Sequence, residues 1–295
     1  MTSDTNSGDA YRARLLKVVA YIDANLGDQL TLDVLAGIAA FSKFHFHRQF
    51  AVLFGLSIFE VVHLARLRRA SYELAFFNRS VIDVALDAGY ESAEAFARAF
   101  KKRFGQTPTE WRAAPDWIAW HDATLPLDNL RRDHMPNAPT TEAVQIVDFR
   151  ETRVAVLEHR GDHRNLGNSI RTFIAWRREN HLPPRTSATF NLLYSDPETT
   201  PPEQFRMDLC AALKGPMPAT NLGLVERTIP GGRCATLRLV GSDQGLGATL
   251  DRLYREWLPT SGEEPRDFPP FVQRVTLYPD VPEHEAITDV FLPIK

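Results

Sequence analysis

The stretch FHFHRQFAVLFGLS, residues 44–57, returns fifty residues later as EAFARAFKKRFGQT, residues 94–107. The second copy keeps the phenylalanines, one arginine and a glycine: Phe96, Arg98, Phe100, Phe104 and Gly105 match Phe46, Arg48, Phe50, Phe54 and Gly55. The phenylalanines recur at helical spacing, which predicts one apolar stripe per copy with the arginine on the opposite face. His45 and His47 become alanine in the second copy. Two residues apart on a helix, they point about 200° apart, so a shared metal ion is not expected.

Helix start signals surround both copies. Ser57 with Glu60, and Thr107 with Glu110, have the capping-box spacing, in which a hydroxyl and a carboxylate each bond a free backbone N–H, and Pro108 suits a first helical position. Further N-cap residues are Thr31, Ser42, Ser80 and Ser92. The pattern predicts seven helices, at about 11–25, 31–38, 43–54, 57–77, 80–87, 92–104 and 108–113.

Each copy follows a shorter helix across a tight turn, AAFS or DAGYES, which is the arrangement of a helix-turn-helix. The helix expected between the copies has some 20 residues and spans about 30 Å. Successive major grooves on one side of B-DNA lie about 34 Å apart. One chain is therefore expected to place two recognition helices in consecutive grooves of double-stranded DNA.

The outward faces of the two expected recognition helices carry the candidate DNA contacts. Arg48 and Arg98 occupy equivalent positions, and arginine reads guanine by a bidentate hydrogen bond. Phe44 suits a thymine methyl group, and Glu94 suits cytosine N4 or the orientation of Arg98. Expected phosphate contacts are Lys43, His47, Lys101, Lys102 and Arg103. The alternative is that these side chains are simply solvated, as on most amphipathic helices.

Length and composition are those of a globular protein of about two domains: 295 residues, 44% hydrophobic and 24% charged. Residues 10–114 hold 14 Lys and Arg against 10 Asp and Glu, whereas residues from 115 onward hold 20 against 25. Only the basic first half is expected to meet a polyanion. Without an apolar run of about 18 residues, and with a polar start, the chain is expected to be soluble and cytoplasmic, with no membrane association. Cys210 and Cys234 are expected to be buried and reduced.

Residues 115–140 mix prolines and polar residues with little periodicity, and they are expected to form a linker. After it a second repeat appears, at an offset of eighty: Arg153, Ala155, Leu157, Gly161, Leu166 and Gly167 return as Arg233, Ala235, Leu237, Gly241, Leu246 and Gly247. Each copy is expected to form two strands, a helix and two more strands. The predicted fold is therefore multidomain: an all-α tandem helix-turn-helix domain, followed by an α+β domain of two pseudo-symmetric ββαββ repeats.

The segments FSKFHFHRQFAVLFGLS, RLRRASYELAF and VIDVALDAGYESAEAFARAFKKRFGQTPTEWR give residues 10–114 a resemblance to the AraC-type DNA-binding domain. The resemblance implies a seven-helix transcription regulator with two helix-turn-helix units. Base-facing positions of the first unit would be Phe44, His47 and Arg48, and those of the second Glu94, Ala95 and Arg98. Glu94 and Ala95 make the second unit less basic than is common in that family.

The segments RVAVLEHRGDH, IPGGRCATLRL and ITDVFLPI give residues 141–295 a resemblance to the GyrI-like effector-binding domain. The resemblance implies a small-molecule pocket between the two halves, often for cationic or amphipathic aromatic compounds. Many members carry a glutamate in the third strand of the second copy, where this chain has Gln273 and Arg274. Glutamine offers neutral hydrogen bonds, so a neutral or anionic ligand is expected.

Candidate ligand contacts are the aromatic residues near the expected groove together with that glutamine: Trp176, Tyr194, Tyr254, Trp257, Phe271 and Gln273. The alternative for each aromatic is an ordinary core position, because large aromatics dominate protein cores. His159 and His163 are four residues apart, but they lie where a strand passes into a helix and lack a third ligand. Neither a metal nor a cofactor is expected.

The sequence favours a ligand-responsive transcription regulator whose partners are double-stranded DNA, an unknown small-molecule effector and RNA polymerase. Its oligomeric state, operator and effector stay open. A second hypothesis is that the C-terminal domain hydrolyses or sequesters a toxic small molecule, with Glu158, His159, Asp208 or Asp289 as a base, although no motif supplies a nucleophile. A third is a DNA-binding scaffold whose second domain binds a protein.

Overall fold

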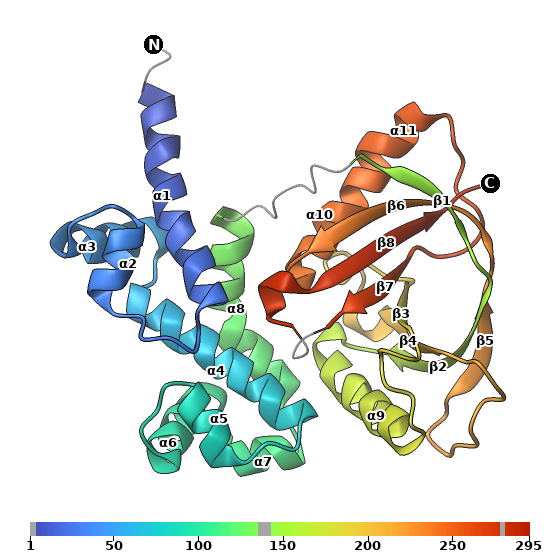
Figure 1. Ribbon diagram of the computed structural model, residues 1–295, viewed down its shortest axis with the longest axis horizontal. Coiled ribbons are helices and arrows are strands. Elements are labelled where there is room, and N and C mark those ends of the chain that lie inside the picture. The colour runs from blue at the N-terminus through green and yellow to red at the C-terminus, as the bar shows by residue number, and fades with distance from the viewer. Residues whose placement is uncertain (1–3, 135–142, 278–280) are drawn as a thin grey trace. The chain divides into compact units, whose positions relative to one another are not determined.

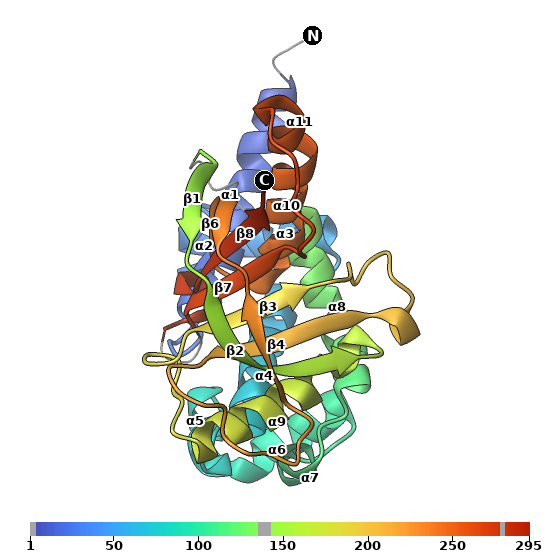
Figure 2. The same ribbon diagram turned by 90° about the vertical axis from the view of Figure 1, so that its right-hand side faces the viewer.

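The computed structural model describes residues 4–134, 143–277 and 281–295. The chain divides into two compact units, residues 1–136 and 137–295. Figures 1 and 2 show a helical first unit and a second unit built on a sheet. Among the described residues no single helix is long and apolar enough to cross a membrane; α3 and α4 pass that test of length and composition only as a pair bent by 65°.

The first unit consists of helices joined by short turns (Figure 1). Their bounds are α1 Asp4–Ala24, α2 Leu32–Ile38, α3 Lys43–Phe54, α4 Ile58–Phe76, α5 Val81–Asp87, α6 Ala93–Phe104, α7 Pro108–Ala113 and α8 Trp117–His134. The seven helices expected from the sequence are confirmed within one or two residues at nearly every end. The exception is the start of α1, seven residues earlier than expected.

The N-cap predictions explain why these helices begin where they do. Ser57 Oγ accepts a hydrogen bond from Glu60 N at 3.2 Å, and Glu60 Oε2 accepts one from Ser57 N at 2.8 Å. Thr107 and Glu110 form the same capping box at the start of α7. The expected side-chain cap at Ser42 does not form, although its backbone is extended as at an N-cap.

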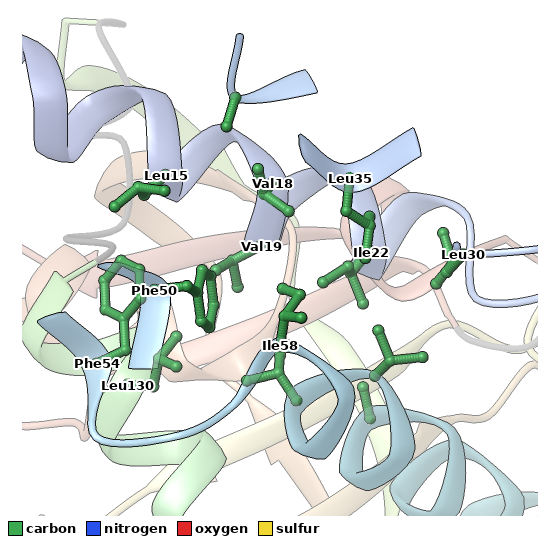
Figure 3. Packing of buried hydrophobic residues seen from close by; sticks show 14 of the residues in the cluster. Leu15, Val18, Val19, Ile22, Leu30, Leu35, Phe50, Phe54, Ile58 and Leu130 are labelled. Carbon is green, nitrogen blue, oxygen red and sulfur yellow. The ribbon is translucent and has the colours of Figure 1, made fainter. Parts of the chain in front are cut away.

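The first unit has two hydrophobic cores, one for each helix-turn-helix. The first core joins α1, α2, α3 and the beginning of α4, and Figure 3 shows Phe50 and Phe54 of α3 packed beside Leu15 and Val19 of α1. The second core joins the end of α4 to α5, α6 and α7 around Phe100. The predicted phenylalanine stripes are confirmed as the buried faces of α3 and α6.

Helix α8 corrects the prediction of a linker at residues 115–140 over residues 117–134; the remainder of that prediction, residues 135–140, lies outside the described residues. The helix runs along α4 and contributes to both cores: Leu127 and Leu130 belong to the first, and Trp117 and Trp120 to the second. Figure 3 shows Leu130 in the first cluster. The sequence prediction was wrong because Pro126, an unfavourable residue inside a helix, hides an apolar face that recurs every three or four residues.

Polar contacts also attach α8 to the helices below it. Trp120 Nε1 donates to the buried Ser71 Oγ of α4 at 2.7 Å. Ion pairs join Arg68 of α4 to Asp128 at 3.3 Å and Arg131 to Asp23 of α1 at 2.5 Å. Because α8 is held at both of its halves, it links the two helix-turn-helix motifs together with α4.

The second unit contains an eight-stranded antiparallel sheet in the order β1-β6-β8-β7-β3-β4-β2-β5. The strands are β1 Gln145–Phe149, β2 Thr152–Arg160, β3 Thr189–Leu193, β4 Arg206–Ala212, β5 Val225–Ile229, β6 Gly232–Val240, β7 Phe271–Thr276 and β8 Ile287–Pro293. Helix α9, Leu166–Glu179, packs on β2 and β4. Helix α10, Leu246–Asp251, packs on β6 and β8. The chain then continues through a π-helical segment, Arg252–Trp257, into α11, Leu258–Ser261.

The eighty-residue repeat is confirmed as two copies of strand, strand, helix, strand, strand. Strands β3 and β7 pair at the centre, Phe190 opposite Gln273. The first strand of each copy pairs with the other copy, β1 with β6 and β5 with β2. The pseudo-symmetric α+β prediction is therefore correct, with an exchange of strands that the repeat alone did not reveal.

The sheet curls into a half-barrel, and its two faces differ (Figure 2). One face packs on α9 and α10 through residues such as Ala155, Leu209 and Leu237. We call the opposite face the inner face; its buried centre is formed by Val154, Val156, Phe190, Leu192, Cys210, Cys234, Phe271 and Phe291. Residues paired across neighbouring strands lie on the same face of the sheet, so the register shows to which face each of the remaining strand residues belongs.

Candidate DNA interface and effector site

Helix α3 presents its predicted DNA contacts to solvent. Phe44 is 81% exposed although it is large and apolar, and His47 and Arg48 are exposed beside it. Lys43, at the start of the helix, forms an ion pair of 3.3 Å with Asp33 of α2, with both side chains largely exposed. The predicted contacts of helix α3 are therefore all accessible to solvent.

Helix α6 presents the equivalent face. Glu94, Arg98, Lys101 and Lys102 are exposed, and Ala95 is partly buried. Hydrogen bonds from the backbone and Ser92 at the helix start lower the pKa of Glu94, with a smaller contribution from the charge of Arg98. The carboxylate is therefore engaged mainly by its own helix terminus.

Arg48 and Arg98 are equivalent in structure as well as in sequence. Neither forms an ion pair or a side-chain hydrogen bond within residues 4–134, 143–277 and 281–295. In contrast, the expected phosphate contact Arg103 is partly buried, and its guanidinium donates to the carbonyl of Ala123 in α8. That expectation for Arg103 is corrected: the side chain attaches α6 to α8.

The two turns before the recognition helices use the same left-handed backbone with different residues. Gly89 adopts φ +78°, whereas the corresponding Ala40 adopts φ +52°. Arg14 of α1 holds the first turn by donating to the carbonyl of Ala39 at 2.8 Å and to that of Ala40. Arg66 of α4 occupies the space beside Gly89, where a Cβ atom would lie 2.5 Å from its guanidinium. The first turn is thus held by hydrogen bonds from Arg14, whereas Arg66 packs against the second turn and donates to the carbonyls of Leu26 and Asp28.

Helix α4 sets the distance between the motifs. Its 19 residues span about 28 Å. Each recognition helix ends at a left-handed glycine, Gly55 or Gly105, whose N–H bonds the carbonyl four residues earlier. The first unit therefore repeats one rigid recognition element at a separation comparable with one turn of B-DNA, about 34 Å.

The six predicted ligand contacts of the second unit do not come together. Trp176 of α9 is 1% exposed in the core between α9 and the sheet, and Tyr254 and Trp257 lie on the helix that covers the other half of the sheet. The helix-covered side is filled by core packing, so these three residues do not line the inner face. The other three, Tyr194, Phe271 and Gln273, do belong to that face, although Phe271 is fully buried there.

The inner face carries an ion cluster that the sequence did not predict as a unit, formed by Glu158, Arg206, Asp208 and Arg227. Cross-strand pairing places Glu158 opposite Asp208. Asp208 accepts from both arginines at 3.2 Å, and Glu158 accepts from Arg227 and, at 3.5 Å, from Arg206. The side chain of Asp208 is fully buried and that of Glu158 is 24% exposed. Each carboxylate is thus shared by the same two guanidiniums.

Neighbouring groups tune this cluster. Burial alone would raise the pKa of Glu158, but a hydrogen bond from Arg160 and the charges of the other arginines lower that pKa below its ordinary value. Tyr194 lies under the guanidinium of Arg206, with Cζ 3.7 Å from the ring centroid, and is still 38% exposed. Burial, and then the negative charge of Asp208, raise the pKa of Tyr194. The phenol is therefore neutral near pH 7.

The second copy has a simpler charge pattern at the equivalent positions. Asp289 forms a bidentate pair with Arg238, at 2.7 and 2.9 Å. Arg238 stands eighty residues after Glu158 and therefore replaces that carboxylate. Gln273 lies between Phe190 and Asp289 in the register and has no side-chain hydrogen bond within the described ranges. The inner face is thus asymmetric in charge despite its symmetric backbone.

Of the four suggested bases, the three carboxylates are occupied by arginine, and His159 lies on the helix-covered side. His159 Nδ1 is 2.9 Å from Ser169 Oγ, and its ring is 5% exposed against Phe205. Burial lowers the pKa of His159. In the described part of the chain no group of three His, Cys, Asp or Glu side chains is placed to hold a metal ion.

Comparison with known proteins agrees with both units. Residues 142–295 match the GyrI-like small molecule binding domain, and residues 35–114 match a helix-turn-helix domain. The "Probable transcriptional regulator YgiV" of Escherichia coli strain K12 is 38% identical over 152 residues, 51% of this chain and 95% of that protein. The regulatory protein SoxS of the same strain is 32% identical over 95 residues, 32% of this chain and 89% of that protein.

Among solved structures, a transcriptional regulator from Chromobacterium violaceum with an AraC-type DNA-binding domain is 26% identical, covering 35% of this chain and 93% of that one with a TM-score of 0.34. Since the GyrI-like match covers more than half of the chain, the protein belongs to the GyrI-like family, and an AraC-type helix-turn-helix domain precedes its small molecule binding domain.

Proposed function

We propose that this ligand-responsive transcription regulator reads double-stranded DNA by laying α3 and α6 into consecutive major grooves. The observation that carries the proposal is the repetition of one recognition element, with Arg48 and Arg98 exposed at equivalent positions and, among the described residues, in no ion pair or side-chain hydrogen bond. A 19-residue helix separates the two. One chain then provides what a helix-turn-helix dimer provides with two.

The proposed contacts divide into base readers and phosphate contacts. Arg48 and Arg98 pair with guanine edges, and Phe44 packs on a thymine methyl group. Glu94 and Ala95 lie at the start of α6, where a short side chain lets the helix approach the bases. Lys43, His47, Lys101 and Lys102 contact phosphates, which orient the protein without reading sequence.

A gel-shift series on the protein's own promoter region tests these roles. Arg48→Ala and Arg98→Ala should each cost about 1 to 3 kcal/mol at the matching base pair and relax selectivity there. Lys101→Ala should instead weaken binding to all sequences alike and reduce the salt dependence. Lys17→Ala, an exposed charge on α1, is the control and should bind as the wild type does. The base-reading roles are wrong if both arginine variants bind like this control.

In the proposed mechanism an effector bound in the second unit changes DNA affinity, or a contact with RNA polymerase. It does so only to the extent that it binds one arrangement of the protein more tightly than another. The two domain matches support this division of labour. A cytoplasmic location follows for a regulator whose target is the chromosome.

A hydrolytic second unit is the competing proposal, and the contact between His159 and Ser169 is the observation in its favour. A histidine next to a hydroxyl is the start of a nucleophile-base pair. The ring is nearly buried, however, and lies on the face covered by α9, which suits a core hydrogen bond better. Hydrolysis of 4-nitrophenyl acetate by the full chain, lost in Ser169→Ala, would favour the enzyme; equal background rates would remove it.

A further inference from the structure

The two helix-turn-helix motifs share a backbone but present different side chains to DNA. We infer that the first motif selects thymine by packing Phe44 and Phe59 on the C5-methyl groups of its half-site, and that the second motif reads its half-site without them. The inference rests on the proposed function, in which α3 and α6 both enter the major groove. It adds a second methyl contact and a chemical difference between the half-sites, which the two domain matches leave undefined.

The repeat gives each exposed apolar residue of the first motif a polar counterpart in the second. Phe44, Val52 and Phe59 are 81%, 82% and 49% exposed. Fifty residues later stand a carboxylate, an ammonium group and a hydroxyl: Glu94, Lys102 and Thr109. Single exposed apolar residues are common on protein surfaces, so their position carries the inference rather than their exposure. The motifs differ around one shared arginine, Arg48 in the first and Arg98 in the second.

A hollow beside α6 shows where the counterparts of these residues lie. It has a volume of about 390 Å³ and is lined by residues from the starts of α5, α6 and α7, among them Glu94, Ala97 and Thr109. In the first motif the same three positions carry the larger rings of Phe44, His47 and Phe59, and the ring centroids of His47 and Phe59 are 6.2 Å apart. Because Glu94 is a base reader in the proposed function, the residues around this position border the DNA.

Thymine is the base whose edge suits these rings. In the major groove it presents a C5-methyl group, which an apolar side chain such as phenylalanine contacts without a hydrogen bond. Burying one methyl group is worth about fourfold in affinity. One turn of helix rises about 5.4 Å and base pairs of B-DNA are about 3.4 Å apart. The thymine under Phe44 should therefore lie about one or two base pairs from the guanine under Arg48.

The second motif offers charge where the first offers rings. Glu94 suits the amino group of cytosine, which a methyl group cannot replace as a donor. Lys102 adds to the salt-dependent attraction of phosphates, whereas its counterpart Val52 adds no charge to α3. The small side chain of Ala97 leaves the hollow beside α6 open. The first half-site is therefore expected to depend on methyl groups and the second on salt.

The experiment uses the full chain and two versions of the protein's own promoter region, amplified with dTTP or with dUTP, so that they differ in the C5-methyl groups alone. In gel shifts at constant salt the wild type should bind the thymine duplex about sixteenfold more tightly, since two contacts of about fourfold multiply. Phe44→Ala with Phe59→Thr, which installs the hydroxyl of the second motif, should bring this ratio close to one. The matched controls are Glu94→Ala and Thr109→Ala at the counterpart positions, and both should keep the wild-type ratio.

The inference is overturned if the wild type binds both duplexes alike, if the double variant keeps the wild-type ratio, or if the two controls lose as much of it. An effect of methyl groups on DNA shape alone would persist in the double variant and would count against the inference. Should the double variant fail to fold, Phe44→Ala alone should lower the ratio about fourfold, and an unchanged ratio would contradict the methyl contact.

The same gel shifts separate this inference from the proposed function. A wild type that binds both duplexes alike, and that loses affinity on Arg48→Ala, keeps the proposed base reading and removes the methyl contacts. Arg48→Ala and Arg98→Ala that both bind the thymine duplex like Lys17→Ala remove the base readers of the proposed function, whatever the ratio between the duplexes.

Discussion

Leu127→Ala tests whether α8 is part of the DNA-binding unit. Leu127 is fully buried in the first core, where it packs with α1, α3 and α4. Truncating a buried leucine removes its transfer free energy and leaves a cavity, at a cost of roughly 2 to 5 kcal/mol. With about 2 to 4 °C lost per kcal/mol for a unit of this size, the melting temperature should fall by roughly 4 to 20 °C.

The control for this prediction is Leu125→Ala on the same helix. Leu125 is 49% exposed, and the exchange has the same effect on helix propensity, so its cost should stay within about 0.5 kcal/mol. Melting of the full chain is followed by calorimetry, and the transition of the first unit is the one that operator DNA shifts upward. If the two variants melt alike, α8 is not packed on the first core, and the linker expected from the sequence is the better description.

Two further predictions concern the turns and the response to pH. Ala40→Gly should stabilise the first unit by roughly 0.5 to 1 kcal/mol, because glycine adopts the left-handed backbone of this position without strain. Gly89→Ala should destabilise the first unit, because its new methyl group meets Arg66. Melting temperatures of both variants equal to that of the wild type would refute this reasoning. Partial burial, then the charges of nearby arginines and Lys102, lower the pKa of His63 below its ordinary 6.5. The unfolded chain therefore takes up this proton first, so stability should be full above pH 6.5 and fall as the pH drops below it. His63→Gln should flatten that slope in melting curves from pH 5 to 8 (about the range in which histidine titrates), and an unchanged slope would contradict the assignment.

Much of the first unit was predictable because its determinants are local. Capping boxes at Ser57 and Thr107 fix helix starts by contacts within four residues, and the phenylalanine stripes define which faces are buried. Helix α8 was missed because Pro126 and the polar residues around it weigh against a helix locally. The helix is indicated by apolar residues at helical spacing, Trp117, Trp120, Leu127 and Leu130. This spacing predicts a buried face only once the two cores that these residues enter are known, and those cores form only in the folded chain.

The second unit shows the limit of sequence reasoning more clearly. The repeat predicted the strands and the helix of each copy, yet periodicity does not state which strand lies beside which. The ion cluster depends on that information: Glu158 meets Asp208 across β2 and β4, and Arg227 arrives on a strand exchanged from the other copy. Trp176 was proposed as a ligand contact because bulk and aromaticity are the same in a core and in a pocket.

The exchange of first strands has a consequence for how this architecture can arise. A polypeptide carrying a single repeat would lack a neighbour for its first strand, and two such polypeptides would rebuild the eight-stranded sheet as a twofold-symmetric dimer. Joining them in one gene product removes the dependence on concentration. It also releases the halves from identical sequence, so that Arg238 stands in the second copy where the first copy has Glu158. A face without twofold symmetry presents different groups to the two ends of an unsymmetrical molecule, whereas the same face of a homodimer of single repeats presents identical groups to both.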